Sequence, residues 1–201
     1  MLKRFAFFLF LFSGSSFITN AQDTIVLLSG KTIIAIGIEV GMYSVTYHKT
    51  DAGKQKRISP DEVFSIIHID GTERIIYQRD SLEEGDDYTV EQMRMFIRGE
   101  QDAMKYYKNN SNKIAAFACG VGISYFGFYG IVGPAIYSTV TGSFSPDMEK
   151  QKVSDPSLIH VDEYKDGYQR KARDKKIVQS IFYGLAGFAA GVVTYSVVTH
   201  N

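Results

Sequence analysis

Polar and hydrophobic residues alternate along the first part of the chain in the manner of short β-strands. From residue 23 to about residue 78, runs rich in Val, Ile, Thr and Tyr alternate between the two classes and are separated by turn residues. Successive strand side chains point to opposite faces, so this alternation indicates a sheet with one buried face. The predicted strands are Thr24–Leu28, Thr32–Val40, Tyr43–His48, Lys56–Ser59, Val63–Ile69 and Glu73–Tyr77.

Turn signals set the boundaries of these strands. Ser29-Gly30 and Asp70-Gly71 each separate two β-rich runs and predict turns, and the latter is a hairpin signal. Pro60-Asp61-Glu62 predicts one helical turn. Five or six short strands with tight turns are typical of a small barrel of the SH3 or Sm type. The expected fold class is α+β, with a small β-barrel-like domain at residues 23–80 followed by helices.

The motifs of this region resemble a family of exported bacterial proteins with an N-terminal small β-domain and a C-terminal Gly-rich hydrophobic helical region. Three segments carry the resemblance: DTIVLLSGKTI, VTYHKTDAG and ISPDEVFSIIHIDGTERIIY. The resemblance covers about a quarter of the chain and rests on structural turns. It implies a small β-domain outside the cytoplasm and carries over no functional residue.

A linker and a helix are predicted after the β-rich region, over residues 81–112. Four acidic residues within 81–87 indicate a solvated linker. Thr89-Val90-Glu91-Gln92 fits a capping box, which marks the start of a helix. Apolar residues then recur at helical spacing, so an amphipathic helix is expected from Val90 to about Tyr107.

Two long apolar blocks fill much of the C-terminal half. Residues 114–140 and 177–199 are 27 and 23 residues long and contain no charged residue. About 20 apolar residues cross the ~30 Å hydrocarbon core of a bilayer, so two transmembrane helices are predicted, at 113–140 and 177–199. Gly133-Pro134 is expected to end or kink the first. The residues between them, 141–176, predict a loop and a basic amphipathic helix.

Glycine is frequent in both apolar blocks. In lipid, small residues let two helix backbones approach closely, and Gly187 and Gly191 form a GxxxG motif. A general bias toward small residues would give the same pattern. The candidate helix-packing residues are Gly120, Gly127, Gly184, Gly187 and Gly191.

The segments before the two blocks share a design. Gly99-Glu100-Gln101-Asp102-Ala103 precedes Lys113 and the first block, and Gly167-Tyr168-Gln169-Arg170-Lys171-Ala172 precedes Lys176 and the second. Both stretches predict basic helices with aromatic residues, which either lie along the membrane interface or are solvated helices leading into a span.

The N-terminus has the pattern of a cleavable secretory signal peptide, assigned to residues 1–21. Lys3 and Arg4 precede a short apolar run, and Thr19 and Ala21 supply the small residues before a cleavage site. Export would place the β-domain on the extracytoplasmic side of the cell membrane, which we expect to be the inner membrane of a Gram-negative bacterium.

Two spans would then put residues 141–176 in the cytoplasm and the C-terminus outside. Residues 141–176 hold eight Lys or Arg, in agreement with the tendency of cytoplasmic loops to be positive. The five cations between residues 94 and 113 would lie on the outer side and weaken this topology.

Composition and charge narrow the classes of function. The 201 residues carry 22 Lys or Arg and 22 Asp or Glu, a balance that gives no reason to expect a protein that binds nucleic acid. Ser29-Gly30-Lys31-Thr32 mimics only the end of a phosphate-binding loop, because Ile25 stands where the first glycine is required. The four His lack metal-ligand spacing. We therefore expect no catalytic residue, no cofactor, no metal and no enzymatic activity.

These patterns predict an exported, membrane-anchored structural or binding module. Its expected partners are the lipid bilayer and either further copies of the chain or other membrane proteins. Two alternatives stay open: a small oligomeric transport or pore component, and a soluble exported α+β protein with a buried helical hairpin. The lack of ionisable residues in both blocks disfavours a conducting pathway.

Overall fold

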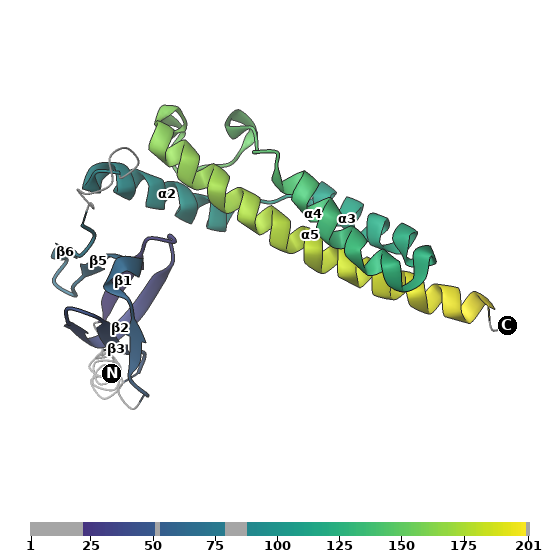
Figure 1. Cartoon of the computed structure of the whole chain (residues 1–201). Helices are drawn as coiled ribbons and strands as arrows, with labels where there is room; N and C mark the ends of the chain where they lie inside the picture. The colour runs from purple at the N-terminus through teal and green to yellow at the C-terminus, as the bar shows by residue number, and fades with distance from the viewer. Residues whose placement is uncertain (1–21, 51–52, 79–87, 200–201) are drawn as a thin grey trace, which may run out of the picture. The chain divides into compact units, whose positions relative to one another are not determined.

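The computed structural model describes residues 22–50, 53–78 and 88–199, and Figure 1 labels its α-helices and all of its strands except β4. The predicted signal peptide at 1–21 and the acidic residues at 81–87 lie outside the described residues. The chain divides into two compact units. The β unit holds the described residues up to Val26 and residues 32–76, and the helical unit holds residues 27–31 and those from Tyr77 onward.

The β unit is a single six-stranded sheet with the strand order β4-β3-β2-β1-β5-β6. The pairs β1–β2, β2–β3, β3–β4 and β5–β6 are antiparallel. All six predicted strands are confirmed with their ends shifted by up to two residues, and Pro60–Glu62 forms the predicted helical turn, η1. The strands are β1 (Asp23–Leu27), β2 (Thr32–Val40), β3 (Val45–His48), β4 (Lys56–Ile58), β5 (Val63–Ile67) and β6 (Glu73–Ile75).

Buried strand residues build the core of the β unit, in consecutive runs in β1 and β5 and at alternate positions in β3. In β3, Val45 and Tyr47 are buried, whereas Thr46 and His48 are partly covered. The hairpin between β5 and β6 is closed by Gly71 at φ +84°, a left-handed conformation that favours glycine. The carboxylate of Asp70 accepts hydrogen bonds from the Thr72 hydroxyl and backbone N–H, which confirms the predicted Asp70-Gly71 turn and lowers the pKa of Asp70.

The expected small barrel is not formed, because the sheet stays open. Closure would require its two end strands, β4 and β6, to pair, and they do not pair in the part of the chain that the structure describes. Each is three residues long and exposes charged side chains, Lys56 and Arg57 in β4 and Glu73 and Arg74 in β6. Short, charged edge strands resist edge-to-edge pairing, which accounts for the difference from the sequence-based expectation.

The helical unit begins with α2 (Val90–Tyr106), as predicted. The Thr89 side chain accepts a hydrogen bond from the Gln92 backbone N–H, and the Gln92 side chain accepts one from the Thr89 N–H, so the capping box is confirmed. The elements that follow are α3 (Asn110–Ile123), η2 (Ser124–Val132), α4 (Gly133–Gly142), η3 (Met148–Lys150), η4 (Pro156–His160) and α5 (Asp162–Thr199).

The first apolar block does not form the expected single transmembrane helix. It divides into α3, the 3₁₀ segment η2 and α4. Gly127 interrupts the helix with φ +61° and ψ −139°, a conformation that is nearly restricted to glycine. Pro134 stands in the first turn of α4, where its missing N–H leaves no helical hydrogen bond unmade. Among the described residues, α5 alone is long and apolar enough to cross a membrane.

α2 and α3 run parallel to α5, one after the other along its length. Phe96 of α2 faces Gly167 near the start of α5, and Phe117 of α3 faces Gly187 in its second half. At 38 residues, α5 is about 57 Å long, enough for both shorter helices to pack against it in succession.

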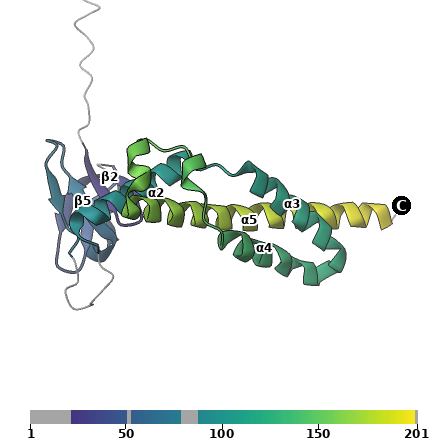
Figure 2. The ribbon, with the colours of Figure 1, turned by 90° about the horizontal axis from the view of Figure 1, so that it is seen from above.

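α4 runs antiparallel to α5, and Figure 2 shows α3 and α4 on either side of that helix. Pro134 at its start lies against Gly184, and Gly142 at its end lies against Ile177. The first apolar block therefore turns back on itself, and both of its ends lie beside the beginning of the second block. This path differs from the single helix that was expected over residues 113–140.

A buried carboxylate connects the elements of the charged half of the helical unit, which comprises α2, the loop before η4 and the beginning of α5. Oδ2 of Asp102 in α2 accepts hydrogen bonds from the Tyr164 hydroxyl (2.6 Å), the Ser154 hydroxyl (2.6 Å) and the Ser154 backbone N–H (2.8 Å). Burial acts to raise the pKa of Asp102, but these hydrogen bonds outweigh it and hold the pKa below its ordinary value. Burial and the same bond raise the pKa of Tyr164. The network ties α2, the loop before η4 and α5 together.

Replacing this carboxylate by an amide is expected to lower stability in a pH-dependent way. Asp102→Asn should reduce the free energy of unfolding by about 1–3 kcal/mol at neutral pH, because hydrogen bonds to a charged acceptor are lost. A depressed pKa stabilises the fold above the unfolded-state pKa and ceases to do so as pH falls through the folded-state pKa. The difference should therefore shrink below about pH 4. Unfolding in detergent, with the exposed Asp174→Asn as control, tests this; a pH-independent difference would contradict it.

Candidate membrane anchor and its surroundings

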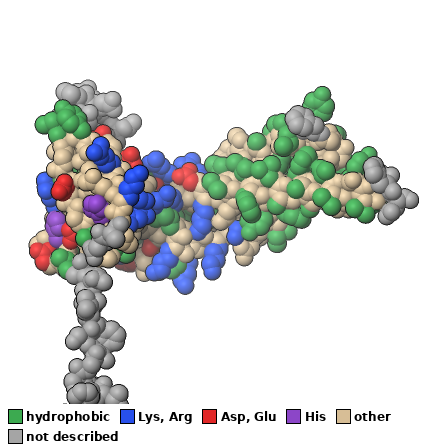
Figure 3. All heavy atoms as spheres, turned by 90° about the horizontal axis from the view of Figure 1, so that it is seen from below, with side chains coloured by type: hydrophobic (Ala, Val, Ile, Leu, Met, Phe, Trp, Pro, Cys, Tyr) green, Lys and Arg blue, Asp and Glu red, His purple; other side chains and the backbone are tan. Residues whose placement is uncertain are grey.

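The outer surface of the second half of the helical unit is apolar. On the face seen in Figure 3, hydrophobic side chains lie over much of this half. Only 17% of the most apolar 18-residue window of α5 is buried, whereas the core helix of a soluble protein would be mostly buried. Large exposed hydrophobic residues here are Ile114, Phe117, Tyr125, Phe126, Tyr129, Ile131, Val132, Ile136, Val140, Phe144, Val178, Ile181, Phe182, Leu185, Val192, Val193, Tyr195, Val197 and Val198.

Inside this apolar surface, α3 and α5 touch backbone to backbone. A β-carbon at Gly120 would overlap the carbonyl oxygen of Gly184, and a β-carbon at Gly187 would overlap that of Phe117. The two contacts are reciprocal, since each glycine faces the carbonyl three residues before the other. Glycine Cα–H groups that face carbonyls in this way can form weak hydrogen bonds, which recur at helix–helix interfaces.

The same reciprocal contact occurs in the charged half, between α2 and α5. A β-carbon at Gly99 would overlap the carbonyl oxygen of Tyr164, and one at Gly167 would overlap that of Phe96. Again each glycine faces the carbonyl three residues before the other. The shared design that the sequence indicates for these two regions thus corresponds to equivalent contacts in the structure.

The remaining candidate glycines play different parts. Gly184 packs against Pro134 of α4, and Gly191 packs against the Ser124 side chain at the end of α3. Gly127 lies in the reversal between α3 and α4, and a β-carbon there would meet nothing within 4 Å. The structure therefore brings Gly120, Gly184, Gly187 and Gly191 together around α5 and leaves Gly127 apart, where its conformation and not its size matters.

Buried polar groups between the apolar helices satisfy one another. The Asn112 side chain donates to the Ser180 hydroxyl (2.7 Å) and accepts from the Tyr137 hydroxyl (3.2 Å), and Ser180 donates to the Lys176 carbonyl (2.8 Å). These bonds link α3, α4 and α5 where the apolar half begins. Such pairing between helices leaves these buried side chains with hydrogen-bond partners.

Four lysines lie near these hydrogen bonds, where the apolar half begins, and are called the basic collar: Lys108, Lys113, Lys175 and Lys176. The Lys175 ammonium donates to the carbonyls of Met104 and Tyr107, both at 2.9 Å, and so caps the end of α2. Burial lowers the pKa of Lys175, and the charges of Lys113 and Lys108 lower it further. Within the described residues, the basic collar pairs with no carboxylate.

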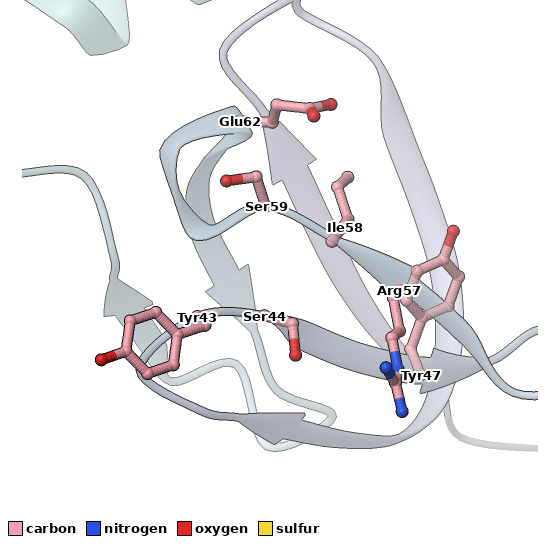
Figure 4. A pocket seen from close by; sticks show the side chains of 7 residues that line it. All are labelled: Tyr43, Ser44, Tyr47, Arg57, Ile58, Ser59 and Glu62. Atoms are coloured by element: carbon pink, nitrogen blue, oxygen red, sulfur yellow. The ribbon is translucent and has the colours of Figure 1, made fainter.

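The β unit carries a separate open pocket of about 480 Å³. Its lining comes from the residues before and within β3, from β4, and from the turn that includes η1, as Figure 4 shows. Two tyrosines, an arginine and a glutamate are among the residues that line this pocket, which suits a polar or aromatic side chain of a partner better than a buried small molecule. The lining residues are Tyr43, Ser44, Tyr47, Arg57, Ile58, Ser59 and Glu62.

Comparisons with protein-family models, with curated proteins and with solved structures found no match. Within the described residues, no group of three or more His, Cys, Asp or Glu side chains is placed to hold a metal ion. Sequence reasoning missed the basic collar, although its signal was present: residues 105–113 and 170–176 together hold eight Lys or Arg and one acidic residue.

A β-carbon at the α3–α5 contact is expected to disrupt the apolar half. Gly187→Ala should lower the free energy of unfolding by about 1–3 kcal/mol, because the added methyl group would meet a backbone carbonyl that cannot move alone. Gly122→Ala is the matched control, since Gly122 lies in α3 with no atom within 4 Å of its β-carbon position. Unfolding of both variants in detergent tests the contact, and equal stabilities would contradict it.

Proposed function

We propose that this protein is an exported, membrane-anchored structural or binding module without catalytic activity, held in the bilayer by the apolar half of its helical unit. The observation that carries the proposal is the exposure of that half. A continuous sheath of large apolar side chains is unfavourable in water and marks a membrane or protein contact. Charged residues are absent from both apolar blocks, so the sheath is uninterrupted.

Helix lengths assign different parts to the two blocks. Residues 177–199 of α5 are 23 residues long, or about 35 Å, and can cross the ~30 Å core of a bilayer. α3 has 14 residues and a length of about 21 Å, which is too short to cross. We infer that α5 crosses once and that α3 and α4 form a re-entrant hairpin, with η2 packed within the membrane against α5.

The proposed location is the cell membrane, with the β unit on the extracytoplasmic side. This orientation is supported by the secretory-signal pattern at 1–21 and by the resemblance of the β-rich segments to exported proteins. With one crossing, the cations before α5 would also lie outside, against the positive-inside tendency. The first hydrophobic segment of a chain usually dominates its orientation, so the signal prevails in this proposal.

The β unit would then supply the binding surface. Its open pocket offers aromatic, cationic and anionic groups, and Tyr43 at the rim has 87% of its surface exposed. A protein partner in the same compartment fits these features, and further copies of the chain could meet through the exposed faces of α4 and α5.

Membrane extraction tests the anchor. The full chain should stay in the membrane fraction after an alkaline carbonate wash and require detergent for release, because the apolar sheath would otherwise meet water. Release without detergent would contradict the proposal and favour a soluble protein whose sheath is covered by another protein.

Cysteine labelling tests the single crossing. In a Cys119→Ser background, Lys105→Cys and Ser157→Cys should react with an impermeant maleimide from the same side of the membrane, because α4 returns the chain. A cysteine at Asn201 should react from the opposite side. If positions 105 and 157 react from opposite sides, the first block crosses the bilayer after all, and the re-entrant arrangement is wrong. Labelling of intact spheroplasts at position 105 decides whether that side is extracytoplasmic.

A further inference from the structure

The basic collar lies at the boundary between the charged and apolar halves of the helical unit. Lys113 is followed directly by exposed Ile114, and Lys176 is followed two residues later by exposed Val178. Figure 3 shows Lys and Arg side chains next to the hydrophobic surface. A molecule that touches these ammonium groups therefore also touches the apolar sheath.

Contacts between the helices gather the lysines of the basic collar from two parts of the chain. The bond from Lys175 to the Tyr107 carbonyl places Lys175 beside the residue that precedes Lys108. The bond from Asn112 to Ser180 holds the beginning of α3, and with it Lys113, against α5 one turn further on. Lys176 reaches the Phe144 carbonyl just after α4 (3.4 Å). Cations from the α2–α3 junction and from α5 are thus brought to one level.

Within residues 22–50, 53–78 and 88–199, no carboxylate forms an ion pair with a lysine of the basic collar. Ion pairs in the described chain are His68–Asp23, Arg94–Glu91 and Lys150–Asp147, and none includes a collar lysine. Two of the four ammonium groups donate to backbone carbonyls, which leaves their charge uncompensated. Like charges held together in this way favour an anionic ligand.

We propose that the basic collar binds the phosphate headgroups of anionic phospholipids, whose acyl chains lie along the adjoining apolar surface. This inference rests on the proposed membrane anchor and adds its lipid preference. An anionic phospholipid can contact both adjacent surfaces at once, because its phosphate is joined to its acyl chains. Free phosphate would contact only the lysines. A zwitterionic lipid would place its own positive charge beside the lysines.

Lipid-dependent stability tests the proposal on the full chain in a mild non-ionic detergent. Phosphatidylglycerol should raise the midpoint of thermal unfolding in a saturable way, because a ligand that binds the folded state stabilises it. Phosphatidylcholine with the same acyl chains and inorganic phosphate should have little effect. Equal shifts with the two lipids would overturn the proposal, and a shift with inorganic phosphate alone would assign the collar to a free anion.

Charge substitutions locate the site. Lys108→Gln with Lys113→Gln should weaken the apparent affinity for phosphatidylglycerol by about 25-fold, at roughly five-fold for each cation near an anionic surface. Lys108→Arg with Lys113→Arg should retain the affinity. The matched control, Lys54→Gln with Lys165→Gln, removes the same charge from exposed positions outside the collar and should leave it unchanged. A Gln pair that behaves like this control would overturn the assignment.

Flotation with vesicles separates this proposal from the anchor itself. The wild-type chain and the Gln pair should both float with pure phosphatidylcholine vesicles, because the apolar sheath alone would insert. If the wild-type chain fails to float with vesicles of either lipid, the membrane anchor is wrong. If it floats but shows no preference for phosphatidylglycerol in the stability experiment, the anchor stands and the role of the basic collar is wrong.

Discussion

The helical unit depends on the close approach of two backbones at reciprocal glycines. Gly120 and Gly187 each occupy a position where a β-carbon would overlap a carbonyl of the facing helix, and Gly99 and Gly167 repeat the arrangement in the charged half. A polar bond between helices, from Asn112 of α3 to Ser180 of α5, accompanies the backbone contact in the apolar half. The glycines remove the atoms that would keep α2 and α3 away from α5.

The equivalence of these contacts constrains the path of the chain. The two glycine pairs are 68 and 67 residues apart in sequence, so the segment from α2 through α3 and the segment that forms α5 are arranged as two parallel copies of one design. Two parallel helices in one chain need a segment that returns from the end of the first to the start of the second. α4 supplies the return within the apolar half, and the positive φ of Gly127 lets the chain reverse. A straight first helix would leave no such path.

Local patterns in the sequence were sufficient to predict the elements with strong signals. The capping box at Thr89, the Asp70-Gly71 turn and the strand boundaries all follow from residues that act on their own neighbours. The sheet was mistaken for a barrel because closure depends on the pairing of distant edges, which strand count alone does not reveal. The first block was expected to form one continuous helix because 27 uncharged residues give the same hydropathy whether the helix continues or reverses at Gly127.

Part of the candidate site could likewise be predicted from local sequence, and part depends on contacts between distant residues. The glycines at 120, 184, 187 and 191 could be selected by type and spacing, yet their partners could not. Selection by type also included Gly127, whose role is conformational. The collar lysines escaped notice because Lys108 and Lys175 are 67 residues apart and meet only through the packing of α2 and α3 on α5.

The position of the break between α2 and α3, beside the basic collar, has a physical reason. A helix that ends leaves backbone carbonyls without partners, and such groups are costly in hydrocarbon. Here the carbonyls of Met104 and Tyr107 receive hydrogen bonds from Lys175, which approaches from the helix that does not break. The ammonium group thus compensates the end of α2 and carries a positive charge to the rim of the apolar surface. The Lys175 side chain of the continuous helix α5 therefore stabilises the break between α2 and α3, and it does so where a bilayer surface would begin.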